Sequence, residues 1–149
     1  MNSELAPLLP HRPPMLMIGR LIACEKDSAS AAKTFHPGDY GSEGGLVLEP
    51  SLIECLAQTM AAMQGRHAVD SHRAPQFGML VGVSGFVFHR RAEVGRELIL
   101  HVKTDASLPP FLLASGQVLQ EGAIIAEGSL KFYVGDAPPN PNPHFSPTD

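Results

Sequence analysis

The clearest pattern in the chain is a helical one near its middle. Between about Leu52 and about His67, apolar and small residues recur so densely that most of the helix circumference is hydrophobic. Pro50 and Ser51 precede this segment, and Ser51 with Glu54 three residues later fits a capping box. The pattern predicts one long helix that is buried on most sides.

After Phe77 the hydrophobic period changes to two. It predicts four successive strands separated by short turns, over residues 79–90, 97–104, 111–119 and 123–134. Gly82 and Gly85 in the first of these strands are suited to bulges or to close backbone approach. One face of the last strand is expected to be buried and contains Ile124, Ala126, Gly128, Leu130, Phe132 and Val134.

Two shorter apolar runs, over residues 15–24 and 29–35, predict a hairpin before the helix. Residues 36–45 contain four glycines and a proline, and are expected to form a loop. A helix that is apolar on most sides needs a sheet that curves around it. The expected fold is therefore α+β, with a curved antiparallel sheet wrapped around one long central helix, the hotdog arrangement. The open sheet edges favour a dimer.

Length and composition narrow the class of protein. We expect one domain over residues 1–135, followed by a disordered tail over residues 136–149, because residues 137–149 contain five prolines. Hydrophobic residues make up 44% of the chain, which excludes a wholly disordered protein. The net charge of −4 and the lack of a basic run argue against nucleic-acid binding. No apolar stretch approaches the ~18–20 residues of a membrane span, and we expect a cytoplasmic protein.

Three motifs occur in a fixed order. Leu9–Arg20 reads LPHRPPMLMIGR, Ile53–Gln58 reads IECLAQ, and residues 80–95 contain LVGV, FHRR and VG. Together they resemble the hotdog 3-hydroxyacyl-acyl-carrier-protein dehydratases of fatty-acid synthesis, whose corresponding motifs are L-P-H-R-x-P-x-L-L-x-D-R, L-E-A-M-A-Q and L-G-V…F-R-R-x-V-x-x-G-D. The resemblance extends from Leu9 to Val134.

The segment before the helix departs from that family. The standard enzymes carry G-H-F-P-G-x-P-x-x-P-G, with a catalytic histidine fourteen residues ahead of the acid, where this chain has Tyr40. Leu48 and Glu49 stand where the family has Pro-Gly. The sequence GSEGGL at Gly41–Leu46 is more similar to the dehydratase-like proteins of aryl-polyene pigment clusters, which also carry L-P-H-R-x-P-M and I-E-x-M-A-Q.

Glu54 is the first candidate for chemistry. A carboxyl group in the first turn of a helix faces the positive end of the helix dipole, and it can protonate a departing β-hydroxyl. The alternative is a capping-box glutamate bonded back to Ser51, but the IECLAQ resemblance favours the catalytic role. Gln58 lies one turn later on the same face. It either holds Glu54 or a substrate water, or is an ordinary satisfied polar group.

Dehydration also requires a base for the α-proton, ordinarily a histidine. His36 lies eighteen residues ahead of Glu54 and is the provisional base; reaching Glu54 requires the glycine loop to fold back. The alternative is a solvent-facing histidine at a strand end. Tyr40, at the family's spacing, can donate a hydrogen bond to substrate. His11 and Arg12 are expected to fix the N-terminal segment by hydrogen bonding rather than to act in catalysis.

Further residues are candidates for substrate binding. Backbone N–H groups near Glu49 and at Gly82 would polarise the thioester carbonyl. Arg90 and Arg91 are candidates for docking an acidic carrier protein or the pantetheine phosphate, or else belong to an ordinary solvated face. The resemblance implies a substrate carried on the phosphopantetheine of acyl carrier protein, with no metal and no cofactor of the protein's own.

The sequence thus predicts a dehydratase-like enzyme that removes water from 3-hydroxyacyl thioesters of acyl carrier protein. Its acyl chain would lie in an apolar tunnel between subunits of a homodimer, or of a hetero-oligomer with another hotdog subunit. Two alternatives stay open. One is a non-catalytic hotdog subunit that pairs with an active dehydratase, supported by the missing G-H-F-P-G motif. The other is a hotdog acyl thioesterase, which uses a helix carboxylate with a water.

Overall fold

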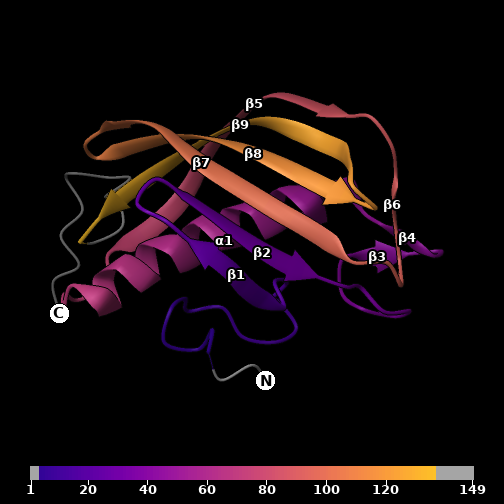
Figure 1. Cartoon of the computed structure of the whole chain (residues 1–149), viewed down its shortest axis with the longest axis horizontal. Coiled ribbons are helices and arrows are strands. Elements are labelled where there is room, and N and C mark those ends of the chain that lie inside the picture. The colour runs from indigo at the N-terminus through magenta and orange to yellow at the C-terminus, as the bar shows by residue number, and fades with distance from the viewer. Residues whose placement is uncertain (1–3, 137–149) are drawn as a thin grey trace, which may run out of the picture.

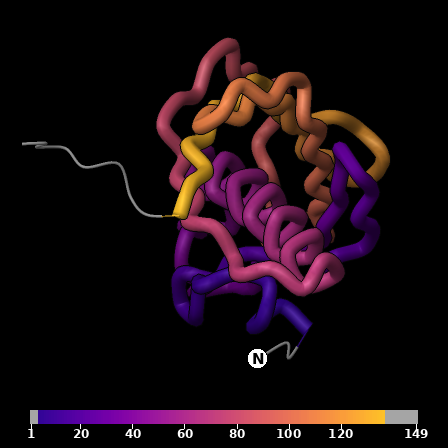
Figure 2. Tube along the Cα trace, turned by 90° about the vertical axis from the view of Figure 1, so that its left-hand side faces the viewer, coloured from indigo at the N-terminus to yellow at the C-terminus, as the bar shows by residue number. Residues whose placement is uncertain are grey.

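A six-stranded sheet curves around the helix α1, which runs from Glu49 to Asp70 (Figure 1). The structure is a computed structural model and describes residues 4–136. Figure 2 shows the helix enclosed between this sheet and the N-terminal segment. The predicted α+β hotdog fold is confirmed. The tail predicted for residues 136–149 lies, apart from Asp136, outside the described residues.

All strand pairs are antiparallel, and the large sheet has the order β1-β2-β7-β8-β9-β5. Three short strands form a second sheet in the order β3-β4-β6. The strands are β1 Arg20–Cys24, β2 Ser28–Lys33, β3 Ser42–Glu43, β4 Leu46–Val47, β5 Phe77–Phe88, β6 Ala92–Glu93, β7 Leu98–Leu108, β8 Phe111–Gln120 and β9 Ala123–Gly135. No helix among residues 4–136 is long and apolar enough to cross a membrane.

The small sheet was not predicted. It lies near the N-terminal end of α1 in Figure 1, and β3 falls within residues 36–45, which were expected to form a loop. Each of its strands has two residues, which is too short for a period of two to be seen in the sequence. The first strand of the predicted hairpin is also shorter than expected. It begins at Arg20 rather than Met15, because the Met15 carbonyl and the Met17 N–H bond to a helix side chain, Gln58.

The start of the helix differs from the predicted capping box. α1 begins at Glu49, and its N-cap residue Leu48 makes no side-chain capping bond. The Ser51 hydroxyl instead donates to the carbonyl oxygen of Gly41 at 2.8 Å. Pro50 suits the first helical turn, where a backbone N–H has no intrahelical acceptor. The capping-box interpretation of Glu54 is therefore wrong, and its carboxylate bonds elsewhere.

The alternating pattern of the last strand is interrupted. Ile125 is fully buried and Ile124 is 39% exposed, the reverse of the prediction. The register between β8 and β9 shifts between Val118 and Leu119, so that the strand carries one extra residue at this point. Beyond this bulge the predicted face is buried, as the positions of Leu130 and Phe132 show.

Strand β5 also has irregular pairing, as its glycines predicted. Its register with β9 shifts between Leu80 and Gly82, and again between Ser84 and Val87. Gly85 lies inside the second irregularity and has a φ of 60°, a conformation that favours glycine. β5 is an outer strand of the large sheet, so these bulges shape one of its two edges.

Candidate active site

Gln58 joins the helix to the N-terminal segment. Its side chain is fully buried, and its Oε1 accepts the backbone N–H of Met17 at 2.8 Å. Its Nε2 donates to the Met15 carbonyl oxygen and to Glu54 Oε1, both at 2.8 Å. The amide is therefore satisfied on both its oxygen and its nitrogen. Gln58 holds the Glu54 carboxylate, which was one of its two predicted roles, and it also anchors the segment that passes over the helix.

The Glu54 carboxylate faces a histidine from that segment. His11 Nε2 lies 3.7 Å from Glu54 Oε1, and the two side chains are 31% and 35% exposed. The other ring nitrogen, Nδ1, is buried and has no hydrogen-bond partner within residues 4–136. The chain thus places an imidazole beside the predicted acid, although the sequence predicted only a structural role for His11.

Arg12 performs the structural role that the sequence assigned to the pair. Its Nη1 donates to the carbonyl oxygens of Leu9 and His11, at 2.9 and 2.8 Å, and its Nη2 donates to that of Ala6 at 3.2 Å. These bonds fold the segment back on itself. The segment then packs on α1 beside Gly65, where a Cβ atom would overlap the Leu8 carbonyl oxygen. No periodicity in the sequence indicates which side chain of this folded segment faces Glu54.

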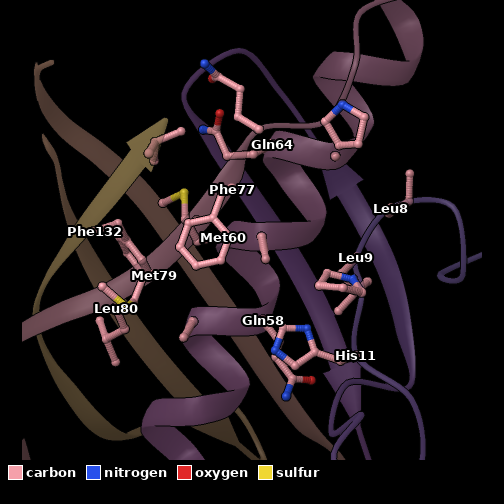
Figure 3. Close-up of a pocket in the computed structure, with 18 of the residues that line it drawn as sticks. Leu8, Leu9, His11, Gln58, Met60, Gln64, Phe77, Met79, Leu80 and Phe132 are labelled. Carbon is pink, nitrogen blue, oxygen red and sulfur yellow. The ribbon is translucent and has the colours of Figure 1, made fainter. Parts of the chain in front are cut away.

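A cavity of about 580 Å³ begins at this cluster and continues along α1. His11, Glu54 and Gln58 line it, and the same cavity reaches Gln64 and Gln76. Figure 3 shows apolar side chains of α1, β5 and β9 on its walls. They include Met60, Phe77, Met79, Leu80 and Phe132. The polar side chains of Glu54, Gln58 and His11 therefore lie at one part of a largely apolar cavity. This arrangement is suited to a ligand with one polar, reactive part and a hydrocarbon chain.

The histidine predicted as base lies elsewhere in the chain. His36 is exposed, and its backbone N–H donates to Asp39 Oδ2 at 2.8 Å. Tyr40 is 57% exposed. Neither residue lines the cavity that contains Glu54. Within the chain, then, the structure does not bring His36 to the cavity, and its catalytic role stays a prediction.

Of the predicted substrate-binding residues, Gln58 lines this cavity, whereas Glu49, Gly82, Arg90 and Arg91 do not. Glu49 is the exposed first residue of α1, and Gly82 lies in β5. Arg90 donates from Nη2 to the Gln120 carbonyl oxygen at 3.2 Å, and Arg91 is exposed. Their roles in thioester and carrier binding stay predictions. Within residues 4–136, no group of three or more His, Cys, Asp or Glu side chains is arranged to hold a metal ion.

Solved structures share this fold. The dehydratase heterocomplex ApeI:P from Xenorhabdus doucetiae superposes with a TM-score of 0.81 at 20% identity, covering 92% of this chain and 91% of that chain. A hypothetical thioesterase from Streptococcus pneumoniae, solved with coenzyme A, gives a TM-score of 0.64 at 8% identity, covering 78% and 86%. At these identities the similarity concerns the fold alone.

Comparisons of sequence identify the family to which the chain belongs. The 3-hydroxyacyl-acyl-carrier-protein dehydratase FabZ of Lactococcus lactis subsp. lactis (strain IL1403) is 24% identical over 136 residues, which cover 89% of this chain and 94% of the relative. The FabZ of Listeria monocytogenes serotype 4b (strain CLIP80459) is 25% identical over 145 residues, covering 91% and 96%. Residues 3–142 match the family model described as ApeP-like, ApeP dehydratase. Because this match extends over nearly the whole chain, the protein belongs to the ApeP-like dehydratase family.

Proposed function

We propose that this protein eliminates water from 3-hydroxyacyl thioesters of acyl carrier protein, with Glu54 as the acid that protonates the departing hydroxyl. The observation that carries the proposal is the position of the Glu54 carboxylate, which Gln58 holds at the edge of an apolar cavity. The FabZ relatives are named for this substrate class. The apolar walls would receive the acyl chain.

The chemistry needs an acid and a base on neighbouring carbons of the substrate. Glu54 Oε1 accepts the Gln58 amide, which leaves Oε2 to face a bound hydroxyl. The N–H of Glu49, at the start of α1, would help to polarise the thioester carbonyl, as would the backbone at Gly82. His36, exposed and outside the cavity, would act as base only if a second subunit presented it to this site.

The edge strand β5 supports assembly with a second subunit. It has twelve residues, and Met79, Val81, Val83 and Val87 on it are 37–48% exposed. A long apolar sheet edge is a liability unless another strand covers it. We propose that β5 pairs with a second hotdog subunit, either another copy of this chain or a different one. The neighbouring structure ApeI:P, a dehydratase heterocomplex, favours a different one. Arg90 and Arg91 would dock the acidic carrier.

The positions of two predicted site residues support a second candidate function. The predicted base His36 and the predicted donor Tyr40 both lie outside the cavity. This favours, as the second candidate, a non-catalytic hotdog subunit that shapes the acyl tunnel of an active partner. A thioesterase would differ in its product, because it would release a free thiol rather than an enoyl thioester.

One assay separates the three functions, dehydratase, non-catalytic subunit and thioesterase. Purified protein is incubated with a 3-hydroxyacyl-carrier thioester, and the enoyl thioester and the free thiol are both measured by mass spectrometry. We expect enoyl product without thiol, and a rate reduced about 10²–10⁴-fold in Glu54→Gln, because a positioned acid contributes about that much. Glu43→Gln is the matched control, since Glu43 is exposed on β3. If neither wild type nor Glu54→Gln forms product, the non-catalytic function holds; released thiol establishes the thioesterase.

A further inference from the structure

We infer that His11 is the base of this site, removing the α-proton of the acyl thioester while Glu54 protonates the β-hydroxyl. The inference rests on the proposed function, which assigns an acid to the cavity, and it names the residue that would act as the base. His11 comes from the N-terminal segment and Glu54 from α1, and both line the same cavity. His36 does not line it.

The separation of the two groups suits the reaction. His11 Nε2 and Glu54 Oε1 are 3.7 Å apart, which is too far for a hydrogen bond between them. They are close enough for both to contact adjacent atoms of one ligand from the same side. In a 3-hydroxyacyl thioester the α-hydrogen and the β-hydroxyl are on adjacent carbons. A base and an acid that act together on them must therefore be near neighbours, as these two side chains are.

Within residues 4–136, no hydrogen bond ties the His11 ring to the rest of the fold. Its Nδ1 is buried without a hydrogen-bond partner within residues 4–136, and Nε2 has only the Glu54 contact. Buried polar atoms without partners are rare in native proteins, and each one calls for an explanation. Its neighbour Arg12 makes three hydrogen bonds to backbone carbonyls and already fixes the segment. Because Nδ1 is buried, Nε2 is the ring nitrogen that can accept a proton from a ligand in the cavity.

The segment that carries His11 is also fixed in position. The Gln58 amide holds Met15 and Met17, and the absence of a side chain at Gly65 lets the Leu8 backbone pack directly on α1. Figure 3 shows the His11 ring beside Gln58, at the part of the cavity opposite Gln64. Catalytic groups need this kind of support, because small displacements cost large factors in rate.

The proton balance of the step closes within the pair. His11 Nε2 takes the α-proton, the electrons of the broken C–H bond form the carbon–carbon double bond, and the C–O bond breaks. The hydroxyl leaves with a proton from Glu54 as water. His11 has then gained one proton and Glu54 has lost one. A single proton transfer between them, directly or through a water, restores both groups without a cofactor or co-reactant.

The test compares histidine variants of the full chain, assembled with its partner subunit where one is present. Enoyl formation from the 3-hydroxyacyl-carrier thioester is measured for wild type, His11→Asn, His11→Ala, His36→Asn and His72→Asn. His72 is exposed after the end of α1 and serves as the matched control. We expect a 10²–10⁴-fold lower kcat in both His11 variants, with His72→Asn within threefold of wild type.

A chemical rescue separates a base from a structural residue. Added imidazole should restore part of the activity of His11→Ala, whose missing ring leaves space in the cavity wall, and should not restore Glu54→Gln. Unfolding temperatures check that each variant is folded. The inference is overturned if His11→Asn stays within threefold of wild type while His36→Asn loses activity, an outcome that leaves the proposed function intact. Loss without rescue in a folded His11→Ala also overturns it. A wild type that forms no enoyl product overturns both.

Discussion

Gln58 Nε2 donates to Glu54 Oε1 across 2.8 Å, one helical turn apart on α1. The same nitrogen donates to the Met15 carbonyl, and the amide oxygen accepts the Met17 N–H. One buried side chain thus orients the proposed acid and anchors the segment that carries His11. The stability of the fold and the geometry of the site are coupled through Gln58.

Replacing Gln58 by leucine should destabilise the fold strongly. The substitution leaves the Met17 N–H and the Met15 carbonyl without their partner, and each buried unsatisfied group costs about 1–3 kcal/mol. We expect the free energy of unfolding to fall by about 2–4 kcal/mol in urea denaturation. Gln64→Leu on the same helix is the control, since Gln64 is only half-buried. Equal effects of the two substitutions would contradict the role given to Gln58.

Gly65→Ala should also destabilise the protein, although alanine is the better helix former by about 1 kcal/mol. The new methyl group would overlap the Leu8 carbonyl oxygen, which is backbone and cannot move without displacing the N-terminal segment. We expect a net loss of about 1–3 kcal/mol, measured by thermal unfolding. Gly82→Ala is the control, because a Cβ there meets Lys131 Cβ at an ordinary 3.5 Å. A higher unfolding temperature for Gly65→Ala would refute the close packing.

The two cysteines should differ in reactivity. Burial raises the pKa of the Cys55 thiol from 9.0 to about 12, so almost no thiolate is present in the folded protein at pH 8. Burial also raises the pKa of Cys24, which is only partly buried. We expect a thiol reagent at pH 8 to label Cys24 slowly and Cys55 only after unfolding, as measured by mass spectrometry. Labelling of Cys55 as fast as Cys24 would show that the helix opens readily.

The same shift predicts a dependence of stability on pH. A thiol whose pKa is raised on folding contributes stability that is complete below the unfolded value of 9.0. That contribution is lost as the pH rises towards about 12, because the unfolded thiol ionises first. Denaturation midpoints should therefore fall more steeply above pH 9 in wild type than in Cys55→Ala. Parallel curves would contradict the prediction.

Disrupting the β5 edge should prevent assembly. Val83 is 43% exposed on this edge, and arginine there would place a charge against the strand of the second subunit. We expect Val83→Arg to lower the molecular mass measured by light scattering to that of one chain. Ile22→Arg is the control, since Ile22 is 47% exposed on β1, the opposite edge. A loss of assembly only in Ile22→Arg would move the interface to that edge.

Local patterns were sufficient for the helix and for most of the large sheet, but not for the three two-residue strands of the small sheet. A dense apolar repeat predicted the buried helix, and a period of two predicted the strands that wrap around it, because both depend on neighbouring residues. The spacing of four between Glu54 and Gln58 also placed both on one helix face, where they hydrogen-bond. Deviations arose where distant groups competed for the backbone. The Gln58 amide hydrogen-bonds the backbone of Met15 and Met17, so these residues do not pair in the first strand. A bulge in the last strand buries Ile125 in place of the predicted Ile124.

The sequence by itself determined the hotdog architecture and the position of Glu54, the proposed acid, on its helix. Only the tertiary structure decided which histidine lies beside that acid. His11 reaches Glu54 because the N-terminal segment folds on itself through Arg12 and packs against Gly65, while His36 lies in an exposed turn. Neither the folded path of a proline-rich segment nor its packing partner follows a period along the chain. Contacts of this kind arise from how separate elements pack together, and residue spacing does not encode them.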